Sequence, residues 1–477
     1  METAKEIAPA APAFATERTE RQNLAWVLLA CLVILVVRAY DAVLNPQFWA
    51  EDGPVYFMTA RIEGARSLLR PYEANTYLIH RALAYAGSFV PVRYAPAFYV
   101  YSTLAITLMM LAYIACSRIQ ARYRGWMAIA AVCVPSTGEV FLRFNNLHWF
   151  LGLAMLVMAI ATDPRTRLGK IVEPAALLCM ALDGPLVFLF APLFVLRAIR
   201  WREVVRWVRC CLSVRGLSRV PVPQERHRAP FRTHYSLLLV AIVGAAAIWQ
   251  MGLVQRHFHL TGTVSPLYKD VLYPGPFNPW DPEWLAFWGN CISGILLLGR
   301  YITEALPKSA AMSVLTLLLY AWLIYYGVRW GNWTYFGFLW AILSVFAALV
   351  YIYHGQPMFA TFSPGWRHSF IPYVCTTWIL LLMMERHGRS ANAAAVLLAF
   401  IALSSLSNFC FARLPDKHWA EKSRGIGGPV PCAVPINGIP EWRWRIYYDP
   451  AIQAGGHAQE PASSQEPPSE HERRRER

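Results

Sequence analysis

The sequence predicts an all-α polytopic membrane protein, and three observations support this fold class. The 477 residues are 56% hydrophobic and 15% charged, whereas soluble domains carry about 25% charged residues. Apolar runs that approach the ~20 residues needed to cross a bilayer recur from Leu24 to Phe409. Arginines and lysines gather in short segments between those runs. One soluble core could not bury so many uniformly apolar helices.

The lengths of the apolar runs predict about 11 transmembrane helices, with 10–13 possible. Residues 1–23 are polar and rich in Ala and Pro, so we expect a disordered N-terminus before a signal anchor. The run 284–301 is expected to be an interfacial or re-entrant helix, because a crossing there would reverse the sides of all later loops. The expected helices are approximately 24–40, 95–116, 126–138, 147–162, 171–183, 185–199, 235–254, 309–328, 333–353, 369–385 and 391–408.

The positions of the basic residues predict the orientation of these helices. Loops rich in Lys and Arg stay on the cytoplasmic side of a membrane. The most basic segment, from Arg197 to Arg232, holds ten arginines and two acids between two apolar runs. We therefore expect a cytoplasmic loop at 200–234 that attracts anionic lipid headgroups, and we expect no nucleic-acid partner. The other predicted inside residues are Arg118, Arg122, Arg124, Arg165, Arg167, Lys170, Arg329, Arg386 and Arg389.

This orientation gives a cytoplasmic N-terminus and a C-terminus on the far, periplasmic side. The transmembrane domain is expected over 24–408, with exterior loops at 41–94, 138–147, 255–308 and 354–368. An exterior segment, 409–454, follows, and then a low-complexity tail, 455–477, which we expect to be disordered. Cys410 and Cys432 both lie in the exterior segment, where a disulfide could form or both could stay as thiols.

The first exterior loop carries the run Phe48-Trp49-Ala50-Glu51-Asp52-Gly53-Pro54. Pro54 suits the first turn of a helix, so the two acids could simply cap that helix and complement its dipole. They could also act as a general base or hold a divalent cation near a phosphate leaving group. The following stretch, 55–69, mixes apolar and charged residues and predicts an amphipathic helix on the membrane surface.

The acidic run and four further segments resemble the GT-C superfamily of membrane glycosyltransferases, in a bacterial branch. The likeness covers roughly residues 40–160, and the further segments are Pro71-Tyr72, Tyr77-Leu78-Ile79-His80-Arg81, Gly138-Glu139-Val140-Phe141 and Asn145-Asn146-Leu147-His148-Trp149. The resemblance implies an enzyme of the bacterial inner membrane. It would transfer a sugar from a polyprenyl-phosphate donor to a glycan, lipid or protein acceptor outside the cytoplasm.

The resemblance also assigns candidate roles to acidic residues. It implies that Asp52 or Glu51 is the catalytic base, and it does not choose between them. Glu139 loosely matches a second acid in another exterior loop. Enzymes of this group differ in metal use, so Mg²⁺ or Mn²⁺ is possible, with Asp52 and Glu51 as the ligands. Asp183 follows a predicted helix end and is either a functional acid at membrane depth or a solvated one.

The donor phosphate of such an enzyme needs cationic partners, and arginine offers a planar, two-pronged one. Each candidate could instead be an interface residue whose charged end reaches water. The candidates for the phosphate are Arg81, His80, Arg143, Arg367, His368 and His354, and those for the sugar or acceptor are Asn145, Asn146, His148 and Trp149. The tail segment 431–438, together with Trp442, could cover the site.

Two other functions compete with sugar transfer. A transporter or lipid flippase would carry polar groups deep within several helices. Here the polar candidates gather toward one face and the predicted helix centres are mostly apolar, which favours chemistry at the membrane surface. An assembly subunit for envelope polysaccharide, in which the acidic pair only caps a helix, is the third possibility.

Overall fold

The computed structural model describes residues 13–135, 139–199, 234–261, 289–298, 310–353, 364–386, 388–406, 409, 413–438 and 444–450. His354, Cys410 and Trp442, most of the loop 200–234, and the tail 455–477 lie outside these residues. Two compact units form. The helical unit comprises Met1–Tyr40, Glu73–Thr76 and Thr103–Ala412, and the loop unit comprises Asp41–Tyr72, Tyr77–Ser102 and Arg413–Arg477.

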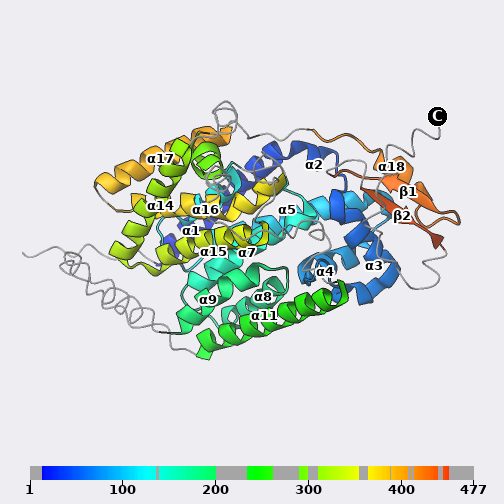
Figure 1. Ribbon diagram of the computed structural model, residues 1–477, viewed down its shortest axis with the longest axis horizontal. Coiled ribbons are helices and arrows are strands. Elements are labelled where there is room, and N and C mark those ends of the chain that lie inside the picture. Colours follow the sequence, from blue (N-terminus) through cyan, green and yellow to red (C-terminus); the bar gives the residue numbers. More distant parts are fainter. Residues whose placement is uncertain are drawn as a thin grey trace, which may run out of the picture. The chain divides into compact units, whose positions relative to one another are not determined.

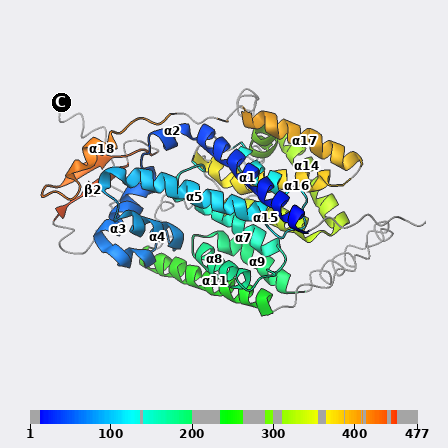
Figure 2. The ribbon, with the colours of Figure 1, turned by 180° about the vertical axis from the view of Figure 1, so that it is seen from behind.

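The helices of the helical unit lie near the positions that the apolar runs predicted, except that the first helix begins at Ala13, within the segment 1–23 predicted to be disordered (Figures 1 and 2). Helix α5, Ala95–Ala115, begins in the loop unit and ends in the helical unit. The number of membrane crossings stays a prediction. The other helices are α1 (Ala13–Arg38), α6 (Arg124–Cys133), α7 (His148–Ile160), α8 (Gly169–Ala181), α9 (Leu186–Ala198), α11 (His234–Thr261), α14 (Ala310–Trp330), α15 (Trp333–Tyr353), α16 (Phe370–Met384) and α17 (Arg389–Leu406).

Four of the described helices are long and apolar enough to cross a membrane. They are Val92–Ala115, His234–His257, Ala311–Trp330 and Arg389–Leu406, and only 22% to 33% of the most apolar stretch of each is buried by the protein. Large apolar side chains such as Leu317, Ile248 and Leu403 therefore remain exposed. Helices that are apolar on their outer faces need lipid rather than water around them. The chain therefore has the surface of a membrane protein.

Helix α7 forms the core of the helical unit, and nearly every residue from Trp149 to Ile160 is buried. Its neighbours are α8, α9, α15 and α16. Two glycines allow this close packing. A Cβ on Gly152 would lie 2.3 Å from the Leu186 side chain, and one on Gly337 would lie 2.2 Å from Ile160. Small residues permit the close backbone approach that packing between apolar helices requires.

Polar contacts join the basic loops at one end of these helices. Arg118 pairs with Glu173 and donates to the Thr162 carbonyl at 2.8 Å. The Glu385 carboxylate accepts the Arg122 backbone N–H at 2.6 Å. Buried Arg197 pairs with Asp163 at 2.7 Å, so it joins the end of α9 to the loop after α7. The loops that the basic residues placed on the cytoplasmic side are thus joined to one another.

A separate set of contacts involves residues near the predicted exterior ends of helices. Buried Arg38 donates to the carbonyls of Val132 and Val134, at 2.6 and 3.0 Å. The Gln250 side chain, on α11, exchanges two hydrogen bonds with the backbone of Thr76, in the predicted first exterior loop. These contacts join helix ends to one another and to the first exterior loop, and the orientation of the helices stays a prediction.

The run 284–301, predicted to be an interfacial or re-entrant helix, is described over residues 289–298. Its described part, the π-helix Gly289–Leu298, packs against α14 and α17, and Ile295 and Leu296 are fully buried. The Ser404 hydroxyl donates to the Leu296 carbonyl at 2.6 Å. The described part of the run is therefore covered by protein helices. This is the physical condition under which an irregular backbone is tolerated at membrane depth.

The loop unit contains short elements from both ends of the chain. The expected continuous amphipathic helix at 55–69 is wrong, because Gly64, with φ of +57°, breaks it. A π-helical turn (Gly53–Phe57), α3 (Met58–Glu63) and a 3-10 helix (Gly64–Leu69) replace it. The other elements are α2 (Tyr40–Leu44, which begins one residue before the unit), α4 (Leu78–Gly87), α18 (Trp419–Lys422) and the antiparallel strands β1 (Cys432–Pro435) and β2 (Arg445–Tyr448), with Cys432 opposite Tyr448.

The Asp163→Asn variant tests the contacts that join the basic loops. It leaves the charge of buried Arg197 without its carboxylate, which we expect to destabilise the helical unit by about 3 kcal/mol. The measurement is thermal unfolding of the purified chain in detergent. Glu421→Gln removes an exposed acid and serves as the control. An Asp163→Asn midpoint equal to that of the control would show that the ion pair does not stabilise the fold.

Candidate functional site

The C-terminal segment pairs with the backbone of the acidic motif. Trp49 and Asn437 form a parallel bridge. The Ala50 N–H donates to the Asn437 carbonyl at 2.6 Å, and the Asn437 N–H donates to the Phe48 carbonyl at 3.3 Å. The Asn437 side chain also donates to Gln47 at 3.0 Å. The tail segment that the sequence proposed as a cover therefore lies directly beside the motif.

Two features show how closely the motif is held. A Cβ on Gly53 would lie 2.6 Å from the Ile446 side chain and 2.9 Å from that of Ile436, so any other residue requires these side chains to shift. Ala50 has φ of +45°, a left-handed conformation that costs an alanine roughly 1–2 kcal/mol. Backbone strain of this kind persists only where surrounding contacts impose it, and it gathers at functional sites.

The two acids of the motif have different environments. Asp52 is 3% exposed, and its Oδ2 accepts the Trp49 backbone N–H at 3.2 Å. This bond closes the 3-10 turn Ala50–Asp52. Asp52 also occupies the N-cap position of the turn that follows, Gly53–Phe57, as predicted, but its side chain makes no capping bond there. Glu51 is partly exposed. The charge of Asp52 also acts on the phenol of Tyr99, and so does the charge of Arg81. The bond from Trp49 thus leaves Asp52 in electrostatic contact with the other polar groups of the unit.

Arg81 is buried among aromatic side chains. Its guanidinium lies 5.0 Å from the centre of the Tyr56 ring, and Nη1 donates to the Val55 carbonyl at 2.7 Å. His80 stacks on Tyr56 with ring centres 5.5 Å apart, and Tyr77 meets His80 edge-on at 5.6 Å. Helix α4 positions both side chains, because consecutive residues in its first turn contact the same π-helical turn after the motif.

The charge of Arg81 has no acidic partner within the described residues. Arg81 is 2% exposed, its Nε has no hydrogen-bond partner there, and the groups that act on its charge are Tyr56, Arg70, Tyr99 and Tyr72. Burial lowers the pKa of the Arg81 guanidinium, and the like charge of Arg70 lowers it further. A buried cation is costly unless an anion compensates it. Arg81 is therefore suited to bind an anionic group with its planar fork.

A second group of candidates forms in the helical unit. Arg367 approaches the Glu139 carboxylate at 3.5 Å. The Asn146 side chain donates to the Glu139 carbonyl at 2.8 Å and accepts the Trp149 indole N–H at 3.3 Å. The His368 ring meets Trp149 edge-on at 5.4 Å. Residues from the loop before α7 and the turn before α16, which the sequence proposed independently, are thus neighbours.

The histidines beside Trp149 are neighbours as well. The His148 and Trp149 rings lie 4.8 Å apart, and His148 Nδ1 lies 3.0 Å from the Asn145 carbonyl oxygen. Burial lowers the pKa of His368 well below its usual value, and the charges of Arg367 and His148 lower it further. His368 is therefore a neutral ring at neutral pH, suited to hydrogen bonding rather than to charge pairing with a phosphate.

The predicted site residues fall into the two units. Glu51, Asp52, His80 and Arg81 belong to the loop unit. Those in the helical unit are Glu139, Arg143, Asn145, Asn146, His148, Trp149, Arg367 and His368, and Arg143 is buried there at 8% exposure. Asp183, also in the helical unit, is buried at the break between α8 and α9. Its functional role stays a prediction.

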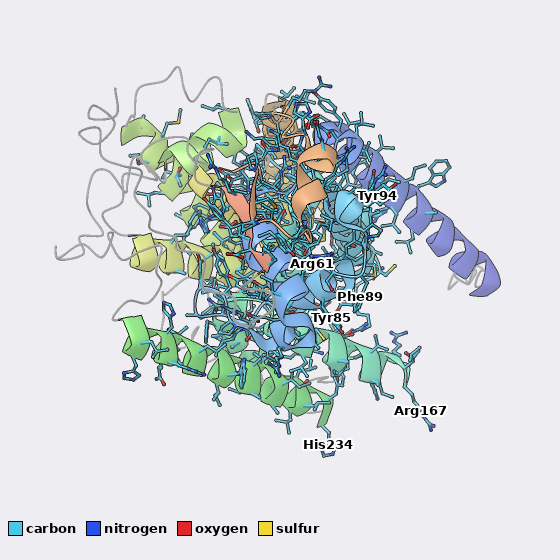
Figure 3. The ribbon with its side chains drawn as sticks, turned by 90° about the vertical axis from the view of Figure 1, so that its right-hand side faces the viewer. Arg61, Tyr85, Phe89, Tyr94, Arg167 and His234 are labelled. Carbon is cyan, nitrogen blue, oxygen red and sulfur yellow. The ribbon has the colours of Figure 1, made fainter. Side chains whose placement is uncertain are left out.

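The sequence analysis missed the tyrosines around Arg81 and a pocket on the loop unit. Tyr77, His80 and Arg81 stand at i, i+3 and i+4, and this helical spacing could have placed them on one face. A pocket of about 270 Å³ is lined in part by Arg61, Tyr85 and Phe89, which lie near one another in Figure 3. The Tyr85 and Phe89 rings are 5.1 Å apart, and such aromatic faces can bind sugars.

The chemistry of the motif permits a metal without defining a site for one. Among the described residues, no three or more His, Cys, Asp or Glu side chains gather as ligands. Mg²⁺ commonly takes only one or two carboxylates together with substrate phosphate oxygens. Glu51 and Asp52 would fit that pattern. Cys432 is a free thiol among the described residues, and the predicted pairing with Cys410 lies outside them.

Fold and site together define a helical membrane protein with an acidic motif beside a buried arginine. The chain matches no protein-family model and no curated protein. It is similar to a solved structure of the archaeal oligosaccharyltransferase AglB from Archaeoglobus fulgidus, in complex with an inhibitory peptide and a dolichol-phosphate. The TM-score is 0.42 and the identity 10%, and the alignment covers 84% of this chain and 57% of AglB. The chain thus spans little more than half of that protein.

Ala50→Gly tests whether the backbone of the motif is strained. Glycine adopts positive φ at no steric cost, so we expect an unfolding midpoint equal to or above that of the wild type. Ala82→Gly, in the exposed face of α4, is the matched control and should lower stability by about 1 kcal/mol. The measurement is thermal unfolding in detergent. Equal losses for both variants would contradict the strain at Ala50.

Proposed function

We propose that this chain is a membrane glycosyltransferase that moves a sugar from a polyprenyl-phosphate-linked donor to an acceptor on the non-cytoplasmic face. One observation carries the proposal: Asp52 is held in the acidic motif by the Trp49 N–H, and the buried cation Arg81, which has no carboxylate partner among the described residues, donates to the Val55 carbonyl directly after the motif. Base and phosphate-binding cation are the two groups that such a transfer requires. The exposed apolar helices supply a surface for the lipid chain.

The proposed reaction is a single displacement. An Asp52 or Glu51 carboxylate takes the proton of the acceptor hydroxyl while its oxygen bonds to the anomeric carbon of the sugar. The bond between that carbon and the phosphate oxygen breaks, and the electron pair leaves with the phosphate. Arg81 stabilises the negative charge of the departing phosphate. A single displacement inverts the configuration at the anomeric carbon.

Asp52 is the preferred candidate for the general base, and Glu51 is the alternative. The Trp49 N–H orients one carboxylate oxygen of Asp52, and the C-terminal segment holds the backbone around it. Such preorganisation is what a general base needs, because a misplaced carboxylate loses rate. A carboxylate can accept several hydrogen bonds, so the bond from Trp49 leaves capacity for the proton of the acceptor.

The second group of residues serves the sugar or acceptor in this proposal. Glu139 is the second acid, and Asn146 and Trp149 offer an amide and an aromatic face, as sugar-binding sites do. Arg367 is already paired with Glu139, so it contributes less free charge to a phosphate than Arg81 does. The proposed location is the bacterial inner membrane, with the N-terminus in the cytoplasm and the C-terminus in the periplasm. A divalent cation at Glu51 and Asp52 would neutralise phosphate charge.

Separate Asp52→Asn and Glu51→Gln variants test the base. We expect Asp52→Asn to lower the rate of transfer by at least about 100-fold, the usual contribution of general base catalysis, and Glu51→Gln to lower it less. The assay follows radiolabelled sugar from membrane lipid to endogenous glycan, with Glu421→Gln as the control. The reverse order would assign the base to Glu51. Unchanged transfer in both variants, with normal membrane insertion, would favour a transporter or assembly subunit.

Arg81→Met tests the phosphate-binding role separately from the fold. Methionine fills a similar volume without charge, and an apolar replacement of a buried, uncompensated cation is often neutral or stabilising. We therefore expect an unfolding midpoint at or above that of the wild type together with a loss of sugar transfer. Exposed Arg66→Met is the control. A lowered midpoint with full transfer would show that Arg81 is structural.

A further inference from the structure

The helical unit has a pocket of about 470 Å³ that the proposed sugar transfer does not use. Two segments line it: the last turns of α14, and the turn from α16 to α17 together with the start of α17. We call it the arginine pocket, and its main lining residues are Tyr325, Tyr326, Arg329, Trp330, Arg386 and Arg389. Its volume is within the range of roughly 300–1,000 Å³ that small ligands occupy.

The arginine pocket is positively charged and contains no acid. Among the described residues, no carboxylate forms an ion pair with Arg386 or Arg389. The Arg386 guanidinium lies 5.4 Å from the centre of the Trp330 ring. The adjacent acid, Glu385, is engaged elsewhere, since it accepts the Arg122 N–H. The pocket therefore attracts an anion, and planar guanidinium groups favour phosphate oxygens.

The position of the pocket indicates the source of that phosphate. Trp330 is the last residue of one helix able to cross a membrane, and Arg389 is the first residue of another. The ends of such helices lie at the depth of lipid headgroups, where tyrosine and tryptophan are enriched. The sides of these helices are apolar, with Ile324 and Val396 exposed, so acyl chains could lie against them. A soluble phosphate would gain nothing from those sides.

We propose that the arginine pocket binds the phosphate of an anionic phospholipid headgroup. Arg386 and Arg389 hold the phosphate oxygens, Arg329 adds charge while it donates to the Tyr325 hydroxyl at 3.1 Å, and the acyl chains follow α14 and α17. The bound lipid would join two hairpins of the helical unit. This site is independent of the proposed sugar transfer, since it uses none of the same residues.

Native mass spectrometry of the purified full chain in detergent tests the site, with phosphatidylglycerol as the probe. We expect the double variant Arg386→Gln, Arg389→Gln to bind it about thirtyfold more weakly. Each basic residue near a membrane surface raises the affinity for an anionic lipid about fivefold, and the double variant loses two. The control, Arg165→Gln with Arg167→Gln, removes the same charge from another exposed basic loop and should bind as the wild type does. If the double variant misfolds, Arg389→Gln alone should bind about fivefold more weakly.

Two further probes separate lipid from free phosphate. Inorganic phosphate should not displace phosphatidylglycerol at equal concentration, because it lacks the acyl chains. Zwitterionic phosphatidylcholine should bind more weakly than phosphatidylglycerol to the wild type and equally to both double variants. Displacement by inorganic phosphate would assign the pocket to a soluble ligand and overturn the proposal. Equal binding of phosphatidylglycerol by the pocket variants and the control would overturn it as well.

Discussion

The apolar outer surface of the long helices is the constraint on which the rest of this structure depends. Helices such as α11, α14 and α17 leave most of their apolar side chains uncovered by protein. Lipid satisfies those surfaces, but it cannot satisfy polar groups. The arginines, acids and histidines must therefore gather at the helix ends or pair with one another inside the bundle. Buried Arg197 beside Asp163, and buried Arg38 on two backbone carbonyls, show both solutions.

Apart from the start of α5, the described residues of the loop unit form no long apolar helix, and the backbone of this unit can therefore be irregular. Around the acidic motif, the backbone changes from a 3-10 turn to a π-helical turn within a few residues. The C-terminal segment stabilises it by supplying backbone partners and by filling the space beside Gly53. The positive φ of Ala50 and the buried charge of Arg81 are both costly, and contacts from elsewhere in the unit must offset them. Costs of this kind are typical of sites kept for function.

The two ends of the helical unit differ in what their charges do. At the end that holds the basic loops, Arg118 and Arg197 are neutralised by acids, while no acid lines the arginine pocket. At the other end, Glu139 and Arg367 neutralise each other beside aromatic and amide groups. The arginine pocket suits an anionic headgroup, and the paired Glu139 and Arg367 suit a neutral, hydroxyl-rich ligand. The same residue types thus give different sites, because their neighbours differ.

The sequence alone determined the helical fold class, the approximate helix positions and the acidic motif, because apolar runs and their charged borders are local features. It also found Arg81 and the Glu139 and Arg367 loops, but not their partners. Tertiary structure decided that Asn437 pairs with the motif, that 55–69 is broken at Gly64, and that 289–298 packs against two helices. These outcomes depend on contacts between residues far apart in the chain. The free energy of such contacts exceeds local preference, and no periodicity in the sequence records it.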